Sequence, residues 1–404
     1  MEFNRRKIFI AVLAALVLTA TAVMYLRFRL QEAAVISTAL SESALRKFGR
    51  EIRFSRVGYL FPAGIYLEAP AVSEKPGFQA GEFLKAERFV LKLRPGMLLK
   101  GRLAVDEIIA EGARAKLRRR AYGGWNFEEL FLLFPESSAS MAVTWNVRHT
   151  EFRNLSLEIR DEQTATNLRA EGIGLKIDHY SGAGGNFSFA VSGVVSGIAA
   201  DALLDGIFKS SGKANFEYSR LASSFGNAEI KNIILGQLSA EKISAGWEVF
   251  GWNRKLQEKN MRLEADGENF RISSSPVYGA SDLRRFVTEP LEIISTVRGK
   301  RLPEMREIRV NIFNARLGFK GGVLTLKPLF IESPAFALGL NLELDGPSGE
   351  MDLKLDARLG GDNLSITACG PVQKPDIKPE LSYTLRRKME VFLQSLAKTL
   401  VKYF

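Results

Sequence analysis

Residues 340–359 read LNLELDGPSGEMDLKLDARL, and this stretch decides the fold. Apolar and polar side chains alternate from Leu340 to Asp345 and again from Met351 to Asp356. Alternation with a period of two predicts strands with one apolar face and one wet face. Asp345-Gly346, between the two runs, is typical of a turn. The stretch therefore predicts two strands of a one-sided sheet.

The same alternation recurs along the chain. It is found at residues 89–93, 113–117, 155–159, 187–191 and 308–312, with turn pieces such as Gly321-Gly322 and Gly360-Gly361. Strands with only one apolar face favour an antiparallel sheet over a parallel sheet buried on both faces. A large one-sided sheet can pair with a second sheet, close into a barrel, or curl around something else.

Composition argues against an enzyme. The 404 residues are 46% hydrophobic, which allows a substantial core. Cys369 is the single cysteine, and His149 and His179 are the two histidines. They exclude a disulfide framework and a multi-histidine metal centre, and they leave little room for a histidine triad. We therefore expect no catalytic residues, no metal and no cofactor.

Residues 8–26 read IFIAVLAALVLTATAVMYL and carry no charge. As a helix they span roughly 28 Å, close to the hydrocarbon thickness of a bilayer. Ala20-Thr21-Ala22 would suit a cleaved signal peptide, but the apolar run continues through Leu26, which favours an uncleaved anchor. A short basic tail before a long domain predicts a single-pass protein with an exported body.

The exported body has a mixed charge. The net charge is +11, and residues 1–30 hold five Lys/Arg and one acid, or +4, which leaves +7 for the rest. Charges of both signs alternate along the predicted strands, so we expect no nucleic-acid partner.

Two helices flank the predicted sheet. Residues 31–48 have helical spacing of apolar side chains, and Gly49 is the expected stop. Residues 385–404 combine apolar positions at helical spacing with Lys and Arg. Such a basic amphipathic helix suits an anionic membrane surface, or it caps the open end of the sheet.

Several motifs, in this order, resemble the AsmA-like family of bacterial envelope proteins. Those in the amino-terminal part are GREIRF at 49–54, EKPGF at 74–78, LKAE at 84–87, LLKG at 98–101, VDEI at 105–108 and GWNFEEL at 124–130. A weaker resemblance covers residues 321–326, 346–355 and 370–376. The middle of the chain, about 165–300, resembles the family only in its pattern of strands. Asn126, with Glu129 three residues on, has the spacing of a helix capping box.

The resemblance implies a mainly β fold, in which a transmembrane helix precedes an elongated antiparallel sheet. That sheet curls into a groove that shields acyl chains, with few short helices. The expected parts are an anchor at 1–30, an amino-terminal helix and sheet at 31–135, a continuing groove at 136–380 and a basic helix at 381–404. The implied place is the bacterial inner membrane, with the bulk of the chain in the periplasm. The implied role is lipid transport to the outer membrane and its assembly. Phospholipids and the inner-membrane bilayer are the expected partners, with other envelope proteins or a second copy beside them.

The inward-facing side chains of the alternating runs are the candidate lipid-binding residues. They are Phe89, Leu91, Leu93, Leu155, Leu157, Ile159, Phe187, Phe189, Leu340, Leu342, Leu344, Met351, Leu353 and Leu355. Each also suits an ordinary core position. One rival interpretation is an envelope scaffold with a closed, dry core that binds an assembly partner. A second is an envelope hydrolase, which His149, His179 and Cys369 would have to serve.

Overall fold

The computed structural model describes residues 42, 45–46, 49–60, 64–94, 105–128, 147–179, 185–199, 202–217, 220–236, 238–251, 258–273, 280–297, 299, 307–379 and 382–402. Two compact units are present, Met1–Arg160 with Gly172–Lys176, and Asp161–Glu171 with Ile177–Phe404. None of the helices among the described residues is long and apolar enough to cross a membrane. The predicted anchor at 8–26 and most of the helix predicted at 31–48 lie outside these residues.

The first unit is a small sheet whose strand pairs fall into two sets. Its strands are β1 (Ile52–Arg53), β2 (Arg56–Leu60), β3 (Gly64–Glu68), β4 (Ala71–Ser73), β5 (Glu82–Lys85), β6 (Arg88–Leu93), β7 (Val105–Glu111), β8 (Arg114–Arg119) and β9 (His149–Asp161), with a 3-10 turn at Phe78–Ala80. The pairs β2–β3, β3–β6 and β6–β7 form one set, and β1–β4, β4–β5 and β5–β8 form the other. Between the two sets, the Ala69 N–H donates to Glu87 O, and the Glu87 N–H donates to Glu111 O.

One pairing corrects the expectation of a purely antiparallel sheet. Strand β9 lies parallel to β7, with Glu107 opposite His149 and Glu111 opposite Arg153. A parallel neighbour requires a long crossover, and residues 112–148 supply it. The alternation within each strand does not reveal the direction of its partner.

Three of the motif segments meet at a buried arginine. Arg50 is 1% exposed, its guanidinium donates to Ser73 O at 2.7 Å, and it lies 4.3 Å above the Phe83 ring. The same guanidinium contacts Asn126 O and lies 3.8 Å from the Glu74 carboxylate. A buried charge needs such a set of partners, so the motifs form the structural centre of this unit.

Asn126, the predicted helix cap, connects strand β8 with Glu74. Its side chain accepts from the Arg118 N–H and donates to Lys116 O and to the Glu74 carboxylate, each at 2.9 Å. One position earlier, Glu128 accepts from the Trp125 N–H at 2.9 Å. The contact predicted between Asn126 and Glu129 stays a prediction. Glu129 lies outside the described residues. Gly49 does end a helical turn, with φ 65° and its N–H donating to Leu45 O.

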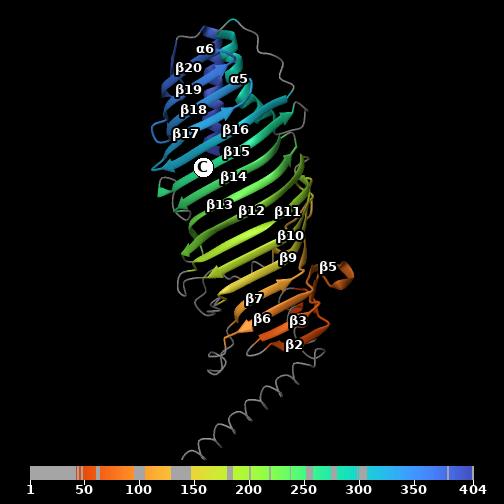
Figure 1. Ribbon diagram of the computed structural model, residues 1–404. Coiled ribbons are helices and arrows are strands. Elements are labelled where there is room, and N and C mark those ends of the chain that lie inside the picture. Colours follow the sequence, from red (N-terminus) through yellow and green to blue (C-terminus); the bar gives the residue numbers. More distant parts are fainter. Residues whose placement is uncertain are drawn as a thin grey trace, which may run out of the picture. The chain divides into compact units, whose positions relative to one another are not determined.

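The second unit is an antiparallel meander (Figure 1). After β10 (Thr166–His179), which is divided between the units, come β11 (Phe187–Ala199), β12 (Ala202–Glu217), β13 (Arg220–Leu235), β14 (Leu238–Phe250), β15 (Asn260–Ser273), α5 (Ala280–Val297), β16 (Glu307–Lys320), β17 (Val323–Glu332), β18 (Phe336–Asp345), β19 (Glu350–Leu359), β20 (Asp362–Pro371), β21 (Asp376–Lys378) and α6 (Tyr383–Lys402). From β11 to β20, each strand pairs with the next in the chain. The turns predicted at 321–322, 345–346 and 360–361 fall between these strands.

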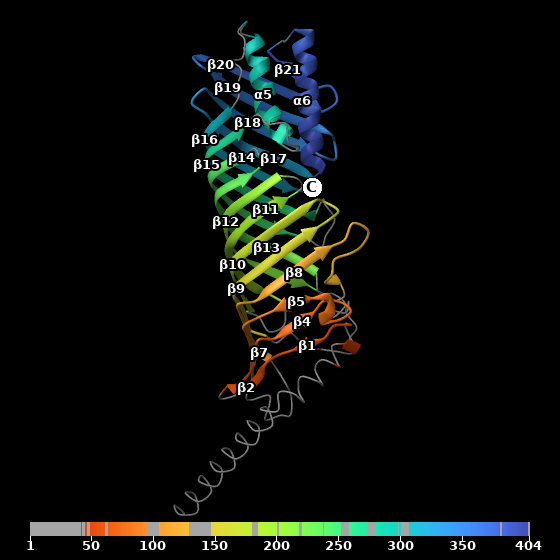
Figure 2. The same cartoon turned by 90° about the vertical axis from the view of Figure 1, so that its right-hand side faces the viewer.

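Helices α5 and α6 lie side by side on one face of β17–β20 (Figure 2). From α6, Met389 and Leu393 are 0% and 2% exposed and pack on the sheet with Ile293 of α5. A helix with one buried apolar stripe and a charged remainder is amphipathic, as predicted for this end of the chain. The helix therefore caps this part of the sheet.

Irregular pairing crosses four neighbouring strands at one level. The ladder pairs skip Asn232, Glu241, Asn269 and Asn311 of β13, β14, β15 and β16, although the register is the same on both sides of the gap. Asn232 and Asn269 have φ of 51° and 55°, a conformation that asparagine tolerates better than most residues. The neighbouring strands therefore depart from the regular pleat together at this level.

The irregular pairing explains why the alternation predicted for residues 308–312 is wrong at its last position. Residues 308–312 alternate as if Ile308, Val310 and Ile312 shared a face. Ile308 and Val310 are 1% and 4% exposed, but Ile312 is 47% exposed. The alternation therefore breaks at Asn311, which lies at the level where Asn269 of the neighbouring strand has a positive φ.

Candidate apolar binding face

One face of β11–β20 is apolar along its whole register. Directly opposite residues in neighbouring strands share a face, so the register defines rows that run across the sheet. The central row is Phe189, Gly212, Gly226, Trp247, Leu263, Leu317, Leu326, Leu342, Leu353 and Ala368. No member of this row is charged or polar in its side chain, apart from the indole N–H of Trp247.

The rows on either side are also mostly apolar, and Ser210 and Ser224 are their two polar members. One consists of Val191, Ser210, Ala228, Ala245, Ala265, Ala315, Leu329, Leu340, Leu355 and Ile366, and the other of Phe187, Ala214, Ser224, Val249, Met261, Phe319, Leu324, Leu344, Met351 and Gly370. Together with the central row, they define what we call the apolar face. The opposite face is largely polar and carries ion pairs such as Lys242–Glu229 at 3.1 Å and Lys327–Glu343 at 2.5 Å.

The apolar face is covered at its carboxy-terminal end. Leu342 and Leu353 are 3% and 1% exposed and belong to one buried cluster with Ile293, Met389 and Leu393 of the two helices. All six candidate residues of β18 and β19 lie here, each 5% exposed or less: Leu340, Leu342, Leu344, Met351, Leu353 and Leu355. In this structure they contact the protein's own side chains.

The apolar face is more open over β11–β15. Phe187 and Phe189 are half-buried, while Leu235 and Leu263 are 41% and 43% exposed. Helices α5 and α6 lie at the other end of the meander (Figure 2). The open part therefore presents apolar surface that the described helices leave accessible.

Two glycines shape the centre of the open part. Gly212 and Gly226 lie opposite each other, and a Cβ on either would come within 2.5 Å of a backbone oxygen of the neighbouring strand. The rings of Phe189 and Trp247 stack 6.5 Å apart, although β11 and β14 are three strand spacings, or about 14 Å, apart. The two aromatic side chains lean toward each other over the glycines, and the Trp247 indole donates to Ser224 Oγ at 3.0 Å.

The candidates in the first unit occupy β6 and β9. Phe89 lies opposite Leu67 and Ala110, and Leu91 lies opposite Ile65 and Ile108. Phe89, Leu91, Leu93, Leu157 and Ile159 are half-buried, while Leu155 is 8% exposed. On the other face of this sheet, Val90 and Ile109 are 5% and 9% exposed, so both faces hold apolar side chains. A contact between the β6 and β9 candidates and lipid stays a prediction.

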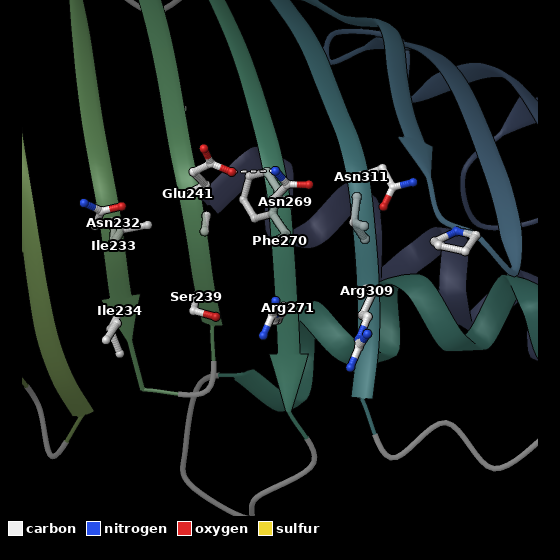
Figure 3. Close-up of a pocket in the computed structure, with 13 residues that line it drawn as sticks. Asn232, Ile233, Ile234, Ser239, Glu241, Asn269, Phe270, Arg271, Arg309 and Asn311 are labelled. Carbon is white, nitrogen blue, oxygen red and sulfur yellow. Dashed lines mark hydrogen bonds between the residues drawn. The ribbon is translucent and has the colours of Figure 1, made fainter.

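A hollow at the irregular pairing is lined by polar and charged side chains together with apolar ones such as Phe270 and Pro334. It measures about 680 Å³, and Figure 3 shows Arg271 and Arg309 side by side on neighbouring strands, with helices behind them. Asn269 donates to the Glu241 carboxylate at 2.6 Å, and Arg309 pairs with Glu307 at 3.0 Å. The arginines point away from Ile272 and Ile308, which pack against α5, so these two side chains belong to the polar face.

The few residues with catalytic potential lie on separate strands. His149 of β9 lies 3.7 Å from the Glu151 carboxylate, and the ring of His179 of β10 is tilted against that of Phe187, with 5.7 Å between the ring centres. Cys369 of β20 donates to Asp352 at 3.4 Å, and burial together with that carboxylate raises the pKa of its thiol. Within the described ranges, no cluster of His, Cys, Asp and Glu side chains suits a metal ion.

Sequence reasoning missed most of the open part. Trp247, Leu263, Leu235 and Met261 were not among the candidates, because glycine, alanine and serine fill many positions of the same face in β12–β15. The signal that could have found them is the pairing of adjacent strands, in which large residues on one strand lie opposite small ones on the next.

A family model described as the AsmA family matches residues 3–283. The match includes the segment predicted as an anchor, all of the amino-terminal motifs and the open part of the apolar face up to β15. The weaker resemblance at 321–376 lies beyond it. Among curated proteins, none matches this chain.

Proposed function

The chain belongs to the AsmA family, and from this premise we propose that its apolar face binds or passes phospholipid acyl chains. The proposed protein is anchored in the bacterial inner membrane, has its body in the periplasm and is not an enzyme. It would support lipid transport from the inner to the outer membrane and outer-membrane assembly. The observation that carries the proposal is the mostly apolar face that continues from β11 to β20, with its open part over β11–β15.

Burial of hydrocarbon supplies the binding energy. Apolar surface removed from water contributes roughly 25 cal/mol per Å², or about 0.8 kcal/mol for each methylene. A chain of about 16 carbons would therefore gain on the order of 10 kcal/mol on such a surface. This gain holds a lipid outside water but does not exceed what a bilayer offers, so the face would equilibrate lipid rather than pump it.

The covered end of the apolar face favours a second candidate. Between β17 and β20, the face is closed by α5 and α6, as expected of a scaffold with a dry core. If the open part were also filled, by segments outside the described residues, the protein would bind partners and not lipid. The two candidates differ in whether lipid accompanies the purified protein.

A pair of matched substitutions tests the lipid proposal. Leu263→Asp places a charge on the open apolar face, whereas Ile207→Asp places one on the polar face, at similar exposures of 43% and 48%. Full-length protein would be extracted in mild detergent, and its bound phospholipid measured by mass spectrometry. We expect lipid with the native protein and with Ile207→Asp, and at least about fivefold less with Leu263→Asp, since a charge on an apolar contact costs more than 1 kcal/mol.

Two outcomes would overturn the proposal. One is a native protein that carries no phospholipid in repeated preparations. The other is a lipid content that does not differ between the two variants, whether both lose lipid or both keep it, since the apolar face would then not be the binding surface. Thermal melting of both variants checks that each remains folded.

A further inference from the structure

A second hollow lies between the two helices of the second unit. It measures about 510 Å³ and is lined by Glu292, Ile293, Tyr383, Thr384, Arg387, Lys388 and Val391. The residues come from the second half of α5 and the first three turns of α6. Of its lining residues, Ile293 packs on the apolar face, whereas Tyr383 and Val391 are 79% and 60% exposed.

The mouth of the hollow is rich in hydrogen-bond donors. Arg387 and Lys388 are exposed, and neither pairs with a carboxylate among the described residues. Their neighbour Arg386 is paired, because its guanidinium lies 3.3 Å from Glu390. Tyr383 and Thr384 add hydroxyl groups, and no acidic residue occurs in the first turn of α6. Glu292 is the one carboxylate in the lining, so the side chains carry a net positive charge.

The floor of the hollow is apolar. Ile293 is 1% exposed and belongs to the buried cluster that also contains Leu342 and Leu353 of the apolar face. Val391, at 60% exposure, provides a further apolar side chain near the cations. A cationic mouth above an apolar floor suits an amphiphile with an anionic head, and neither a wholly polar nor a wholly apolar ligand would use both parts.

We propose that this hollow binds the phosphate head group of an anionic phospholipid. Arg387 and Lys388 would contact the phosphate, since a guanidinium binds it through two parallel hydrogen bonds and an ammonium acts as a point charge. The first acyl carbons would lie against Ile293 and Val391. The inference rests on the proposed function, because it names which lipids the protein prefers and where it receives their head groups.

The test compares head groups on a common tail. The full-length protein in neutral detergent would be titrated with dihexanoyl phosphatidylglycerol, dihexanoyl phosphatidylcholine and glycerol 3-phosphate, and binding measured by calorimetry. We expect the anionic lipid to bind about tenfold more tightly than the zwitterionic one, as two charge-assisted contacts allow. The double variant Arg387→Gln with Lys388→Gln should remove this preference, and Arg386→Gln, on the same helix turn, should keep it.

Each contrary result has a distinct meaning. Equal binding of both lipids, or a preference that survives in the double variant, overturns the head-group site. Glycerol 3-phosphate binding as tightly as the anionic lipid would mark a site for free phosphate and would also overturn it. A preference that depends on Arg387 and Lys388, combined with lipid content unaffected by Leu263→Asp, would preserve this site and reject the proposed function of the apolar face.

Discussion

Glu151 shows how single residues stabilise the first unit. Its carboxylate lies 2.7 Å from Arg153 and 3.3 Å from Lys176, and the residue is 8% exposed. The hydrogen bond from Arg153, followed by that from Lys176, lowers the pKa of this carboxyl from 4.5 to about 2. A carboxyl with a lowered pKa in the folded state stabilises the fold above its unfolded pKa and loses that contribution as pH falls.

We expect Glu151→Gln to flatten the acid side of the stability profile. In the native protein, the free energy of unfolding should fall as pH drops from about 4.5 to about 2, as Glu151 takes up its proton. The variant lacks this titration, so it should be less stable near neutral pH and converge with the native protein at low pH. Urea unfolding across this range measures the difference. Glu158→Gln, at an exposed position of the same strand, is the control, and a Glu151→Gln profile parallel to the native one would contradict the expectation.

Residue identity alone gave an incomplete account of the first unit. The order of the motifs indicated the family, which the family match confirms. It did not indicate that Arg50 is buried, or that the Asn126 side chain binds strand β8 and Glu74. A side chain with several donors and acceptors suits many partners, and only the folding of distant segments selects among them.

At the scale of the element, interrupted strands explain why prediction succeeded at one end of the sheet and failed in its middle. Strands β18 and β19 pair without interruption from Phe336 to Asp345, so strict alternation in the sequence matches the faces. The ladder pairs of strands β13–β16 skip Asn232, Glu241, Asn269 and Asn311. Strict alternation of side chains therefore predicts the wrong face of the sheet for residues beyond these positions. A count of alternating residues does not reveal such a change, although asparagines that tolerate a positive φ, Asn232 and Asn269, lie at it.

The interruption in β15 depends on a residue that tolerates positive φ. At Asn269, where φ is 55°, a β-branched side chain is strained by roughly 1–2 kcal/mol, whereas glycine is not. We therefore expect Asn269→Val to lower the free energy of unfolding by about that amount and Asn269→Gly to change it by a few tenths of a kcal/mol. Chemical denaturation measures both. Asn260→Val, at an exposed position near the start of the same strand, should have little effect, and an equal loss in both valine variants would argue against backbone strain.

At the scale of the whole molecule, the proposed function is passive. The sequence contains no phosphate-binding loop of the nucleotide-hydrolysing type. The free energy gained by burying an acyl chain on the apolar face does not exceed the free energy gained in a bilayer. Any direction of transfer would then come from the membranes and partner proteins, and not from this chain.

We expect purified protein to speed lipid exchange between vesicles without biasing it. Labelled phospholipid should move from donor to acceptor vesicles faster when the protein is present, and the final distribution should equal that reached without it. Fluorescence dequenching of the label follows both the rate and the end point. An end point displaced by the protein, in either direction, would contradict a passive role, and Leu263→Asp should return the rate toward the uncatalysed value.

The meander has a consequence for how such a protein can change in size. Because every strand from β11 to β20 pairs with its sequence neighbours, a hairpin gained or lost leaves all other partnerships in place. Each added hairpin lengthens the sheet by about 10 Å and extends each apolar row by two positions. Duplication of short gene segments would thus adjust the length of the sheet in regular steps, without any change to the existing strand pairs.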